Sequence, residues 1–374
     1  MIDLQVSRKQ IDEIDSQIVK LFEERMKVAN EVAKYKMETG KAVFDKEREE
    51  QKLDSLSKIC HGKFNERAVR ELFSQIMSIS RKYQYGVLPH TDDITDFEKT
   101  EKAFDKEQAK VYYFGVPGTH TQQAMEDVFG EAVQGISCQS FQGVMEAVEN
   151  GQADYGVLPI ENSSTGGIST NYDLLLNYKN AIVGEYVMKI DQCLLALPGT
   201  KLEDIQTVFS HPQALMQCSA FLNDNGLKQI SVENTAVAAK RVVEEGDKSQ
   251  AAIASEIAGK LYGLELLKPF IQNNQGNTTR FVILANRKVY QKDAGKISLC
   301  FELPHTSGSL YNMLGNFIYN GVNMMMIESR PIPGKNWEYR FFVDIEGNLQ
   351  DAGVKNALRG IGAEAQNFKI LGNY

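Results

Sequence analysis

The chain has 374 residues, 43% of them hydrophobic and 24% charged, so it can build two or three cores and is neither disordered nor fibrous. A net charge of −8 without a long Lys/Arg run argues against nucleic acid or an anionic membrane as the main partner and favours small molecules. Five scattered cysteines without a Cys-x-x-Cys pair indicate neither a disulfide framework nor a zinc site. The sequence shows neither an apolar signal core nor a run of about 18 apolar residues, so we expect a cytoplasmic protein.

Residues 8–85 repeat apolar side chains with a helical period, and Gly40 and Gly62 separate three predicted helices. Arg25 and Lys36 fall on the apolar face of the first helix. A single cation there would usually snorkel or pair with an acid, but two on one face favour a buried anion site. Other polar residues also share helix faces: Asp45, Arg48 and Glu49 in the second helix, and Ser80 and Gln84 in the third.

Over about the first 85 residues these positions resemble the all-helical chorismate mutase domain of bifunctional enzymes of phenylalanine synthesis. The matching site residues are Arg8, Arg25, Lys36, Asp45, Arg48, Glu49, Ser80 and Gln84. The resemblance implies an interlocked dimer in which Arg8 reaches the site of the neighbouring chain. It also implies roles in binding chorismate: Arg8 and Arg25 for the carboxylates with support from Arg48, Lys36 and Gln84 for the ether oxygen, and Glu49 and Asp45 for the ring hydroxyl.

Residues 91–110 are charged and poor in aliphatic side chains, which predicts a linker or a solvated helix and therefore a domain boundary. From Val111 onward, short β-branched runs alternate with amphipathic helices, which predicts an α/β domain. In its segment “DYGVLPIENSSTGGIST” we expect a strand stopped by Pro159 and a helix capped by Ser169 or Thr170. The loop between them is either a plain turn or a ligand site at the carboxyl end of a strand.

Similar polar groups follow other predicted strands. Pro212 and Gln213 begin a helix after “TVFSH”, and we expect caps at Asn234 or Thr235 and at Ser255. The polar loop “NNQGNTT” leads into the strand “RFVIL”. Because several predicted strands end in loops with similar polar residues, we expect these loops to line one shared cleft.

The motifs “PIENSSTGG”, “SHPQAL” and “NTTRF”, in this order, resemble prephenate dehydratase over roughly residues 111–285. The resemblance implies a fold like a type 2 periplasmic binding protein, with one α/β lobe near 111–188 plus about 270–290 and the second lobe between. It also implies that Thr279 is the candidate proton donor to the ring hydroxyl of prephenate, with protonated Glu161 left open as the alternative. His120 replaces an aromatic residue of the family, either tuning binding or filling space. The dehydratase site residues carried over are Glu161, Asn162, Ser163, Gln213, Thr279 and Arg280.

The last part of the chain, residues 296–374, predicts the order βαββαβ of a ferredoxin-like α+β sandwich. Its segments “HTSGSLYNML” and “IESRP” resemble the two ligand segments of an ACT domain, an amino-acid-sensing module. The resemblance implies feedback inhibition by L-phenylalanine at a dimer interface. We interpret Met324, Met325 and Met326 as core residues. The predicted effector-binding residues are Gly308, Ser309, Leu310, Glu328, Ser329, Arg330 and Pro331.

We therefore predict a multidomain enzyme without cofactor or metal that acts on chorismate and prephenate and responds to L-phenylalanine. Its predicted parts are a mutase at 1–90, a linker at 91–110, a dehydratase at 111–290 and an ACT domain at 296–374. We expect a homodimer or homotetramer, with neither nucleic acid nor membrane as partner. The alternative is a mutase fused to a non-catalytic sensor of prephenate or an amino acid. A mutase–dehydrogenase fusion would need a dinucleotide fingerprint, and its only near match, residues 360–365, follows a predicted helix.

Overall fold

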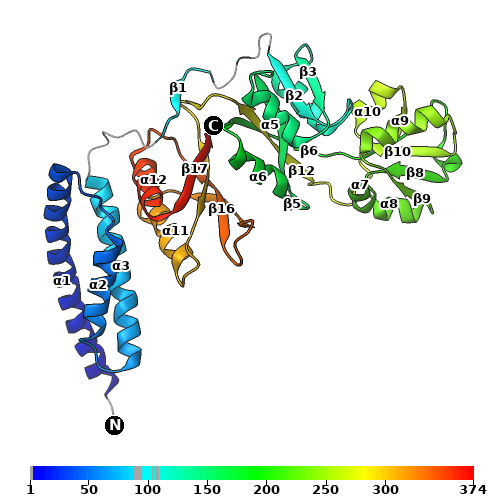
Figure 1. The fold of residues 1–374 in the computed structure, drawn as a ribbon. Coiled ribbons are helices and arrows are strands. Elements are labelled where there is room, and N and C mark those ends of the chain that lie inside the picture. Colours follow the sequence, from blue (N-terminus) through cyan, green and yellow to red (C-terminus); the bar gives the residue numbers. More distant parts are fainter. Residues whose placement is uncertain (1–2, 88–94, 103–104, 106–108) are drawn as a thin grey trace. The chain divides into compact units, whose positions relative to one another are not determined.

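The computed structural model describes residues 3–87, 95–102, 105 and 109–374 (Figure 1). The chain divides into two compact units, Met1–Asp96 with Leu299–Ile370, and Phe97–Ser298 with Leu371–Tyr374. Within the described ranges, no helix is long and apolar enough to cross a membrane.

The first unit begins with the three predicted helices, α1 (Leu4–Thr39), α2 (Lys46–Ser57) and α3 (Lys63–Val87). Gly40 ends α1 in the left-handed conformation, with a φ of 67° that glycine adopts without strain. Asp45 caps α2, because its side chain accepts the backbone N–H of Arg48 at 3.1 Å. These helix boundaries confirm the interpretation of Gly40 and Gly62 as breaks.

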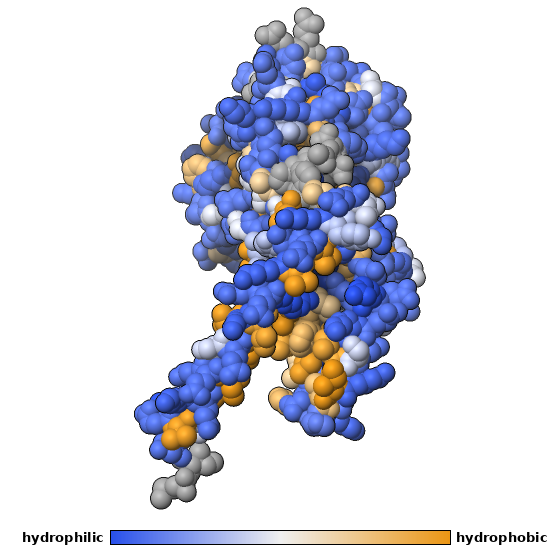
Figure 2. Space-filling view, turned by 90° about the vertical axis from the view of Figure 1, so that its left-hand side faces the viewer, coloured by the Kyte–Doolittle hydropathy of each residue, from blue (hydrophilic) through white to orange (hydrophobic). Residues whose placement is uncertain are grey.

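Among the residues that the structure describes, none covers most of the apolar face of α1. Its buried residues are Ala29 and Ala33, whereas Ile11, Ile14 and Ile18 are 54–55% exposed. Figure 2 shows apolar side chains at the surface near the N-terminal end of the chain. The predicted stripe is therefore present, but it faces solvent.

The C-terminal elements confirm the order βαββαβ: β14 (Lys296–Glu302), α11 (Ser309–Tyr319), β15 (Met324–Pro331), β16 (Tyr339–Glu346), α12 (Ala352–Glu364) and β17 (Gln366–Asn373). The strand order is β15-β16-β14-β17. The interpretation of three core methionines is wrong for Met325, which is 50% exposed: half-buried and exposed residues alternate along β15, and Met325 lies at a register shift against β16. The near match to a dinucleotide motif runs through the last turns of α12, to its C-cap Ala365.

The charged segment 91–110 lies partly outside the described residues. In its described part, Glu98–Thr100 forms a short strand, β1, that pairs in parallel with β13 (Val289–Gln291). Phe97 beside it is buried. The solvated-helix alternative is therefore wrong for residues 95–102, because this stretch packs as extended chain.

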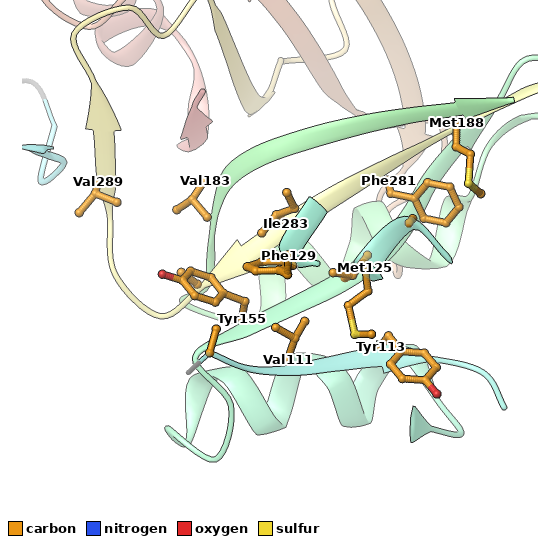
Figure 3. Packing of buried hydrophobic residues seen from close by; sticks show 14 of the residues in the cluster. Val111, Tyr113, Met125, Phe129, Tyr155, Val183, Met188, Phe281, Ile283 and Val289 are labelled. Atoms are coloured by element: carbon orange, nitrogen blue, oxygen red, sulfur yellow. The ribbon is translucent and has the colours of Figure 1, made fainter. Parts of the chain in front are cut away.

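The second unit forms two α/β lobes, each with its own sheet. In the first lobe the strand order is β6 (Ala181–Lys189), β12 (Thr278–Ala285), β4 (Tyr155–Asn162), β2 (Lys110–Phe114) and β3 (Gln134–Cys138), with helices α4 (His120–Phe129), α5 (Phe141–Glu149) and α6 (Ser169–Asn177). Figure 3 shows the buried core of this lobe, where Val111, Phe129 and Ile283 pack together. The segments of this lobe confirm its predicted division; the likeness to type 2 periplasmic binding proteins stays a prediction.

The second lobe has the strand order β11 (Glu265–Lys268), β7 (Cys193–Ala196), β10 (Gln250–Ala254), β8 (Thr207–Ser210) and β9 (Lys228–Ser231). Its helices are η1 (Leu202–Asp204), α7 (Pro212–Gln217), α8 (Ser219–Asp224), α9 (Thr235–Glu245) and α10 (Glu256–Tyr262). Asn234 and Ser255 cap α9 and α10, as predicted. The predicted cap of α6 is wrong: Ile168 precedes that helix, and Ser169 is its first residue.

The prediction that Pro159 stops its strand is also wrong, because β4 continues to Asn162. A β-bulge at Ile160 accommodates the proline: β12 pairs Phe281 with Pro159 and Arg280 with Glu161, leaving Ile160 without a partner in the register. On the other side, the pairing of β4 with β2 ends at Val157. The missing N–H of Pro159 therefore interrupts regular hydrogen bonding with neither β12 nor β2.

Candidate active sites

The helices of the first unit enclose a cavity of about 510 Å³. Five cations and two carboxylates line it, an excess of positive charge that favours an anionic ligand. Arg8 is not part of this lining. The cavity brings together seven of the eight predicted mutase-site residues: Arg25, Lys36, Asp45, Arg48, Glu49, Ser80 and Gln84.

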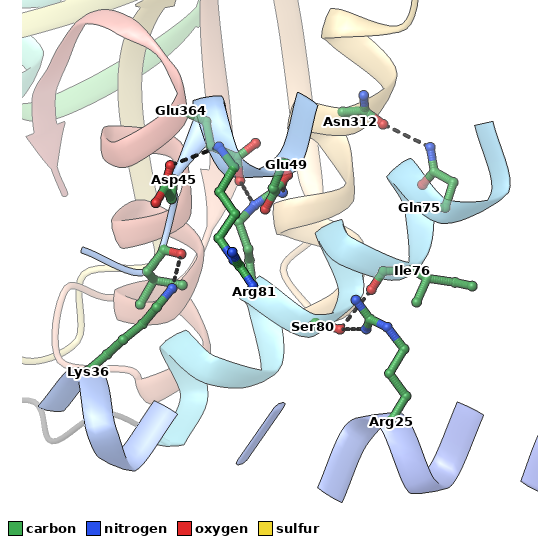
Figure 4. Close-up of polar contacts among 12 residues, drawn as sticks. Arg25, Lys36, Asp45, Glu49, Gln75, Ile76, Ser80, Arg81, Asn312 and Glu364 are labelled. Atoms are coloured by element: carbon green, nitrogen blue, oxygen red, sulfur yellow. Dashed lines mark hydrogen bonds and ion pairs between the residues drawn. The ribbon is translucent and has the colours of Figure 1, made fainter. Parts of the chain in front are cut away.

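Two of these cations donate hydrogen bonds to neutral oxygens (Figure 4). Arg25 donates to the hydroxyl of Ser80, and Lys36 Nζ donates to the carbonyl oxygen of Val43 at 2.7 Å. Burial lowers the pKa of both groups, although nearby Glu49 opposes the shift in each. Because neither hydrogen bond is made to an acid, both cations keep a charge that can attract an anionic ligand.

Arg81 also lines the cavity, although it is not among the predicted site residues. Its Nη1 lies 2.5 Å from Glu49 Oε2, and its Nε lies 3.0 Å from Glu364 Oε1 in α12. Burial lowers the pKa of Arg81, but Glu364 and Glu49 together raise it more, so the guanidinium stays charged. Helical spacing could have revealed this residue, because Arg81 lies four residues after Met77 and three before Gln84, on the face that lines the cavity.

In the second unit, β4 and β12 place four predicted dehydratase residues opposite one another: Asn162 faces Thr279, and Glu161 faces Arg280. Asn162 Nδ2 donates to Thr279 Oγ1 at 2.9 Å and to Asn277 Oδ1 at 2.8 Å. Arg280 forms ion pairs with Glu161 at 3.2 Å and with Glu185 at 3.4 Å. The sheet register therefore assembles this part of the site.

The two remaining dehydratase residues join the same network. Ser163 Oγ accepts the backbone N–H of Thr278 at 2.9 Å. Gln213, in the first turn of α7 in the second lobe, donates to Thr165 Oγ1 at 3.2 Å, and Thr165 in turn donates to Asn162 Oδ1 at 3.3 Å. The network therefore bridges the two lobes.

Glycine allows the chain to reverse within this network. Residues Gly166 and Gly167 form β5, which pairs back on Asn162 and Glu161, and Gly166 has a φ of 80° that a side chain rarely permits. A neighbouring cavity of about 310 Å³ is lined by Thr165 and Asn277 from the network, but not by the six predicted residues themselves.

His120 is the first residue of α4, and its Nε2 is buried without a hydrogen-bond partner in the described structure. Burial lowers its pKa, although Asp191 opposes the shift, so the imidazole is neutral at pH 7. The hydroxyl of the preceding Thr119 is also buried without a partner among the described residues.

In the C-terminal elements, a cavity of about 140 Å³ lies at the start of α11. Ser309 and Leu310, two predicted effector residues, line it, and Gly308 is the N-cap of the helix. The other predicted effector residues, 328–331, lie on β15 and do not line this cavity. The structure of one chain therefore brings only part of this set together.

Comparison with known proteins identifies both catalytic domains. Residues 7–85 match the family model of chorismate mutase type II, and residues 111–289 match that of prephenate dehydratase. The bifunctional chorismate mutase/prephenate dehydratase of Aquifex aeolicus is 33% identical, with 100% of this chain and 98% of the relative covered. That of Escherichia coli K12 is 34% identical, with 98% of this chain and 95% of the relative covered.

Among solved structures, prephenate dehydratase from Arthrobacter aurescens in complex with L-Phe is 30% identical, with a TM-score of 0.66. That comparison covers 71% of this chain and 89% of the other. Because the two bifunctional relatives match this chain over nearly its whole length, the chain belongs to the family of bifunctional chorismate mutase/prephenate dehydratases.

Proposed function

We propose that this chain rearranges chorismate to prephenate in the cavity of its first unit and converts prephenate to phenylpyruvate between the lobes of its second unit. The cation-rich cavity that contains seven predicted residues is the main support. The rearrangement is pericyclic and has no covalent intermediate. The protein therefore has only to select a compact dicarboxylate conformer and to stabilise the charge that develops on the ether oxygen.

The contacts in the cavity support distinct roles. Arg25 and Arg48 bind the carboxylates, because a guanidinium matches a carboxylate geometrically. Lys36 and Gln84 donate to the ether oxygen, Lys36 through Nζ and Gln84 through its amide N–H groups, since both residues line the cavity. Asp45 and Glu49 orient the ring hydroxyl.

Arg8 completes the site of a second copy of the chain. It lies outside the cavity of its own chain, and it shares α1 with the exposed residues Ile11, Ile14 and Ile18. An exposed apolar stripe of this length is typical of a protein–protein interface. Mixing inactive Arg8→Ala chains with inactive Lys36→Ala chains should restore about a quarter of the mutase rate, since half of the dimers are mixed and each has one complete site. No recovery after subunit exchange would contradict the shared site.

The dehydratase step breaks the bond to the ring hydroxyl and the bond to the departing carbon dioxide, while the ring becomes aromatic. The hydroxyl needs a proton in order to leave. Thr279 is the donor that we favour: its oxygen accepts a hydrogen bond from Asn162, so its own hydrogen is directed elsewhere. Glu161 forms an ion pair with Arg280, which a protonated Glu161 would not form.

His120 contributes to ligand binding in this proposal. A buried ring nitrogen without a partner costs free energy, so simple space filling explains it poorly. We expect this nitrogen to hydrogen-bond to bound prephenate.

The C-terminal elements act as an ACT domain that binds L-phenylalanine and inhibits the enzyme. The cavity beside Ser309 and Leu310 lies at the N-terminus of α11, where backbone N–H groups favour a carboxylate. The relative from Arthrobacter aurescens was solved in complex with L-Phe, which supports this effector. The residues on β15 would complete the site across a dimer interface.

Product analysis after supplying chorismate alone, with and without phenylalanine, tests the whole proposal. We expect phenylpyruvate to form and its rate of formation to fall when phenylalanine is present. Accumulation of prephenate without phenylpyruvate would instead favour the alternative, a mutase fused to a non-catalytic sensor. Unchanged dehydratase kinetics at saturating phenylalanine would contradict the regulatory assignment.

A further inference from the structure

We propose that Arg81 and Glu364 position the carboxylate of Glu49 in the mutase cavity, so that the C-terminal α12 helix completes the mutase site. This inference rests on the proposed mutase function. The three residues come from three different helices of the first unit, α2, α3 and α12 (Figure 4). Arg81 and Glu364 are positioning residues, because they orient the carboxylate of Glu49; Arg81 also lines the cavity itself.

The geometry of the guanidinium links the two acids. Arg81 uses Nη1 for Glu49 at 2.5 Å and Nε for Glu364 at 3.0 Å. Because these nitrogens belong to one planar group with fixed donor directions, the bond to Glu364 restricts the plane in which Glu49 can bind. Phe44 contributes a further constraint, since the guanidinium lies 4.8 Å from its ring centroid.

Burial makes this arrangement important for the cavity. The side chains of Arg81, Glu364 and Glu49 are 8%, 11% and 23% exposed. Charges removed from water in this way depend strongly on their partners, and removing one partner leaves the others poorly compensated. Without the charge of Glu364, Arg81 would attract Glu49 more strongly and draw it away from the substrate.

Helix α3 is well placed to transmit such an effect, because it contacts both C-terminal helices. Gln75 donates to Asn312 of α11 at 2.9 Å, and Lys82 Nζ lies 4.6 Å from the ring centroid of Tyr319. Gly315 of α11 approaches Lys82 so closely that a Cβ there would clash with its Nζ. The same helix carries Ser80 and Gln84 into the cavity. A displacement of α12 would move Glu364, and the ion pairs of Arg81 with Glu364 and Glu49 would pass this movement on to Glu49.

A double-mutant cycle tests this inference in the full-length chain. We expect Glu364→Gln to lower kcat/KM for chorismate about tenfold, mainly through kcat, while dehydratase activity stays unchanged. In a Glu49→Gln background the same substitution should change the mutase rate less than about twofold, because its route to the substrate has been removed. The matched control is Glu346→Gln, an acid on β16 that hydrogen-bonds Asn323 and should leave both activities unchanged.

Equal effects of Glu364→Gln in both backgrounds would overturn the inference, because Glu364 would then act independently of Glu49. If Glu364→Gln also lowers dehydratase activity, the substitution has disturbed folding, and Arg81→Lys replaces it in the same cycle. Lysine keeps the charge but lacks the planar fork, so we expect the same loss and the same dependence on Glu49. A wild-type chain without mutase activity would instead contradict the proposed function itself.

Discussion

The two candidate sites of this chain use charge in opposite ways. In the mutase cavity five cations face two carboxylates, and Arg25 and Lys36 hydrogen-bond to neutral oxygens. In the dehydratase network Arg280 is already paired with Glu161 and Glu185, and the other contacts join amides and hydroxyls. The first arrangement suits conformer selection in a dianion, and the second suits delivery of one proton in a defined direction.

The sharpest test of this contrast is Thr279→Ala, for which we expect dehydratase kcat to fall about 10²- to 10⁴-fold while mutase activity is unchanged. The substitution removes the hydroxyl that accepts the Asn162 hydrogen bond. Thr279→Ser should retain much of the rate, and Thr278→Ala is the neighbouring control. Steady-state assays of both reactions give the answer, and equal loss of both would indicate misfolding.

The mutase cavity gives the next largest effect. Lys36→Ala should lower the mutase rate about 10²- to 10³-fold, because a preorganised donor to the ether oxygen is lost. Lys34→Ala, at an exposed position two residues earlier in α1, is the matched control. Circular dichroism and the dehydratase rate check the fold; a Lys36→Ala enzyme that keeps most of its mutase rate refutes the assigned role.

Ionic strength should affect substrate binding at the two sites differently, with a smaller effect than the two substitutions above. Raising KCl from about 0.05 M to about 0.5 M should increase KM for chorismate about fivefold, because screening weakens the attraction between the cation-rich cavity and a dianion. KM for prephenate should change less than about twofold, since Arg280 is already neutralised by two acids. Equal salt dependence of the two KM values would contradict the proposed contrast.

The smallest expected effect is a change with pH in the thermal stability that Lys82, the neighbour of Arg81 in α3, contributes. Burial lowers the pKa of Lys82 from its ordinary 10.5 to about 8, although Glu364 opposes the shift. Below pH 8 this lysine is charged in both states; between pH 8 and 10.5 only the unfolded chain keeps the proton, so its contribution to stability rises with pH. The Tm of Lys82→Met minus that of wild type should therefore decrease by about 2 to 4 °C from pH 7 to pH 10. If the difference in Tm between Lys82→Met and wild type does not change with pH, the pKa of Lys82 is not lowered in the folded chain.

Local sequence patterns predicted most of the elements and the two cations on the apolar face of the first helix, whereas the full set of mutase-site residues rested on the family resemblance. The positions of Arg25 and Lys36 followed from helical period, and capping chemistry identified Asn234 and Ser255. The link from Arg81 to Glu364 was beyond such reasoning, because 283 positions separate the partners and only tertiary packing joins them.

Pairing between distant strands explains the main error of local reasoning. A proline within a strand ordinarily predicts its end, but β12 pairs around Pro159 through a bulge. Whether β4 can form a bulge at this point depends on its partner strand β12, which lies more than a hundred positions later in the sequence. The same limitation applies to Met325, which lies at a register shift in the pairing of β15 with β16.

The bulge at Ile160 also constrains where this chain can change in length. Side chains alternate along a strand, so one extra residue decides which face Glu161 and Asn162 present. Deleting Ile160 would move the carboxylate of Glu161 and the amide of Asn162 each to the face opposite to the one it now occupies. The residues of the site would stay the same, but their side chains would point the wrong way. The fold of this chain should therefore tolerate a longer or shorter loop after β4 far better than the loss of this single residue.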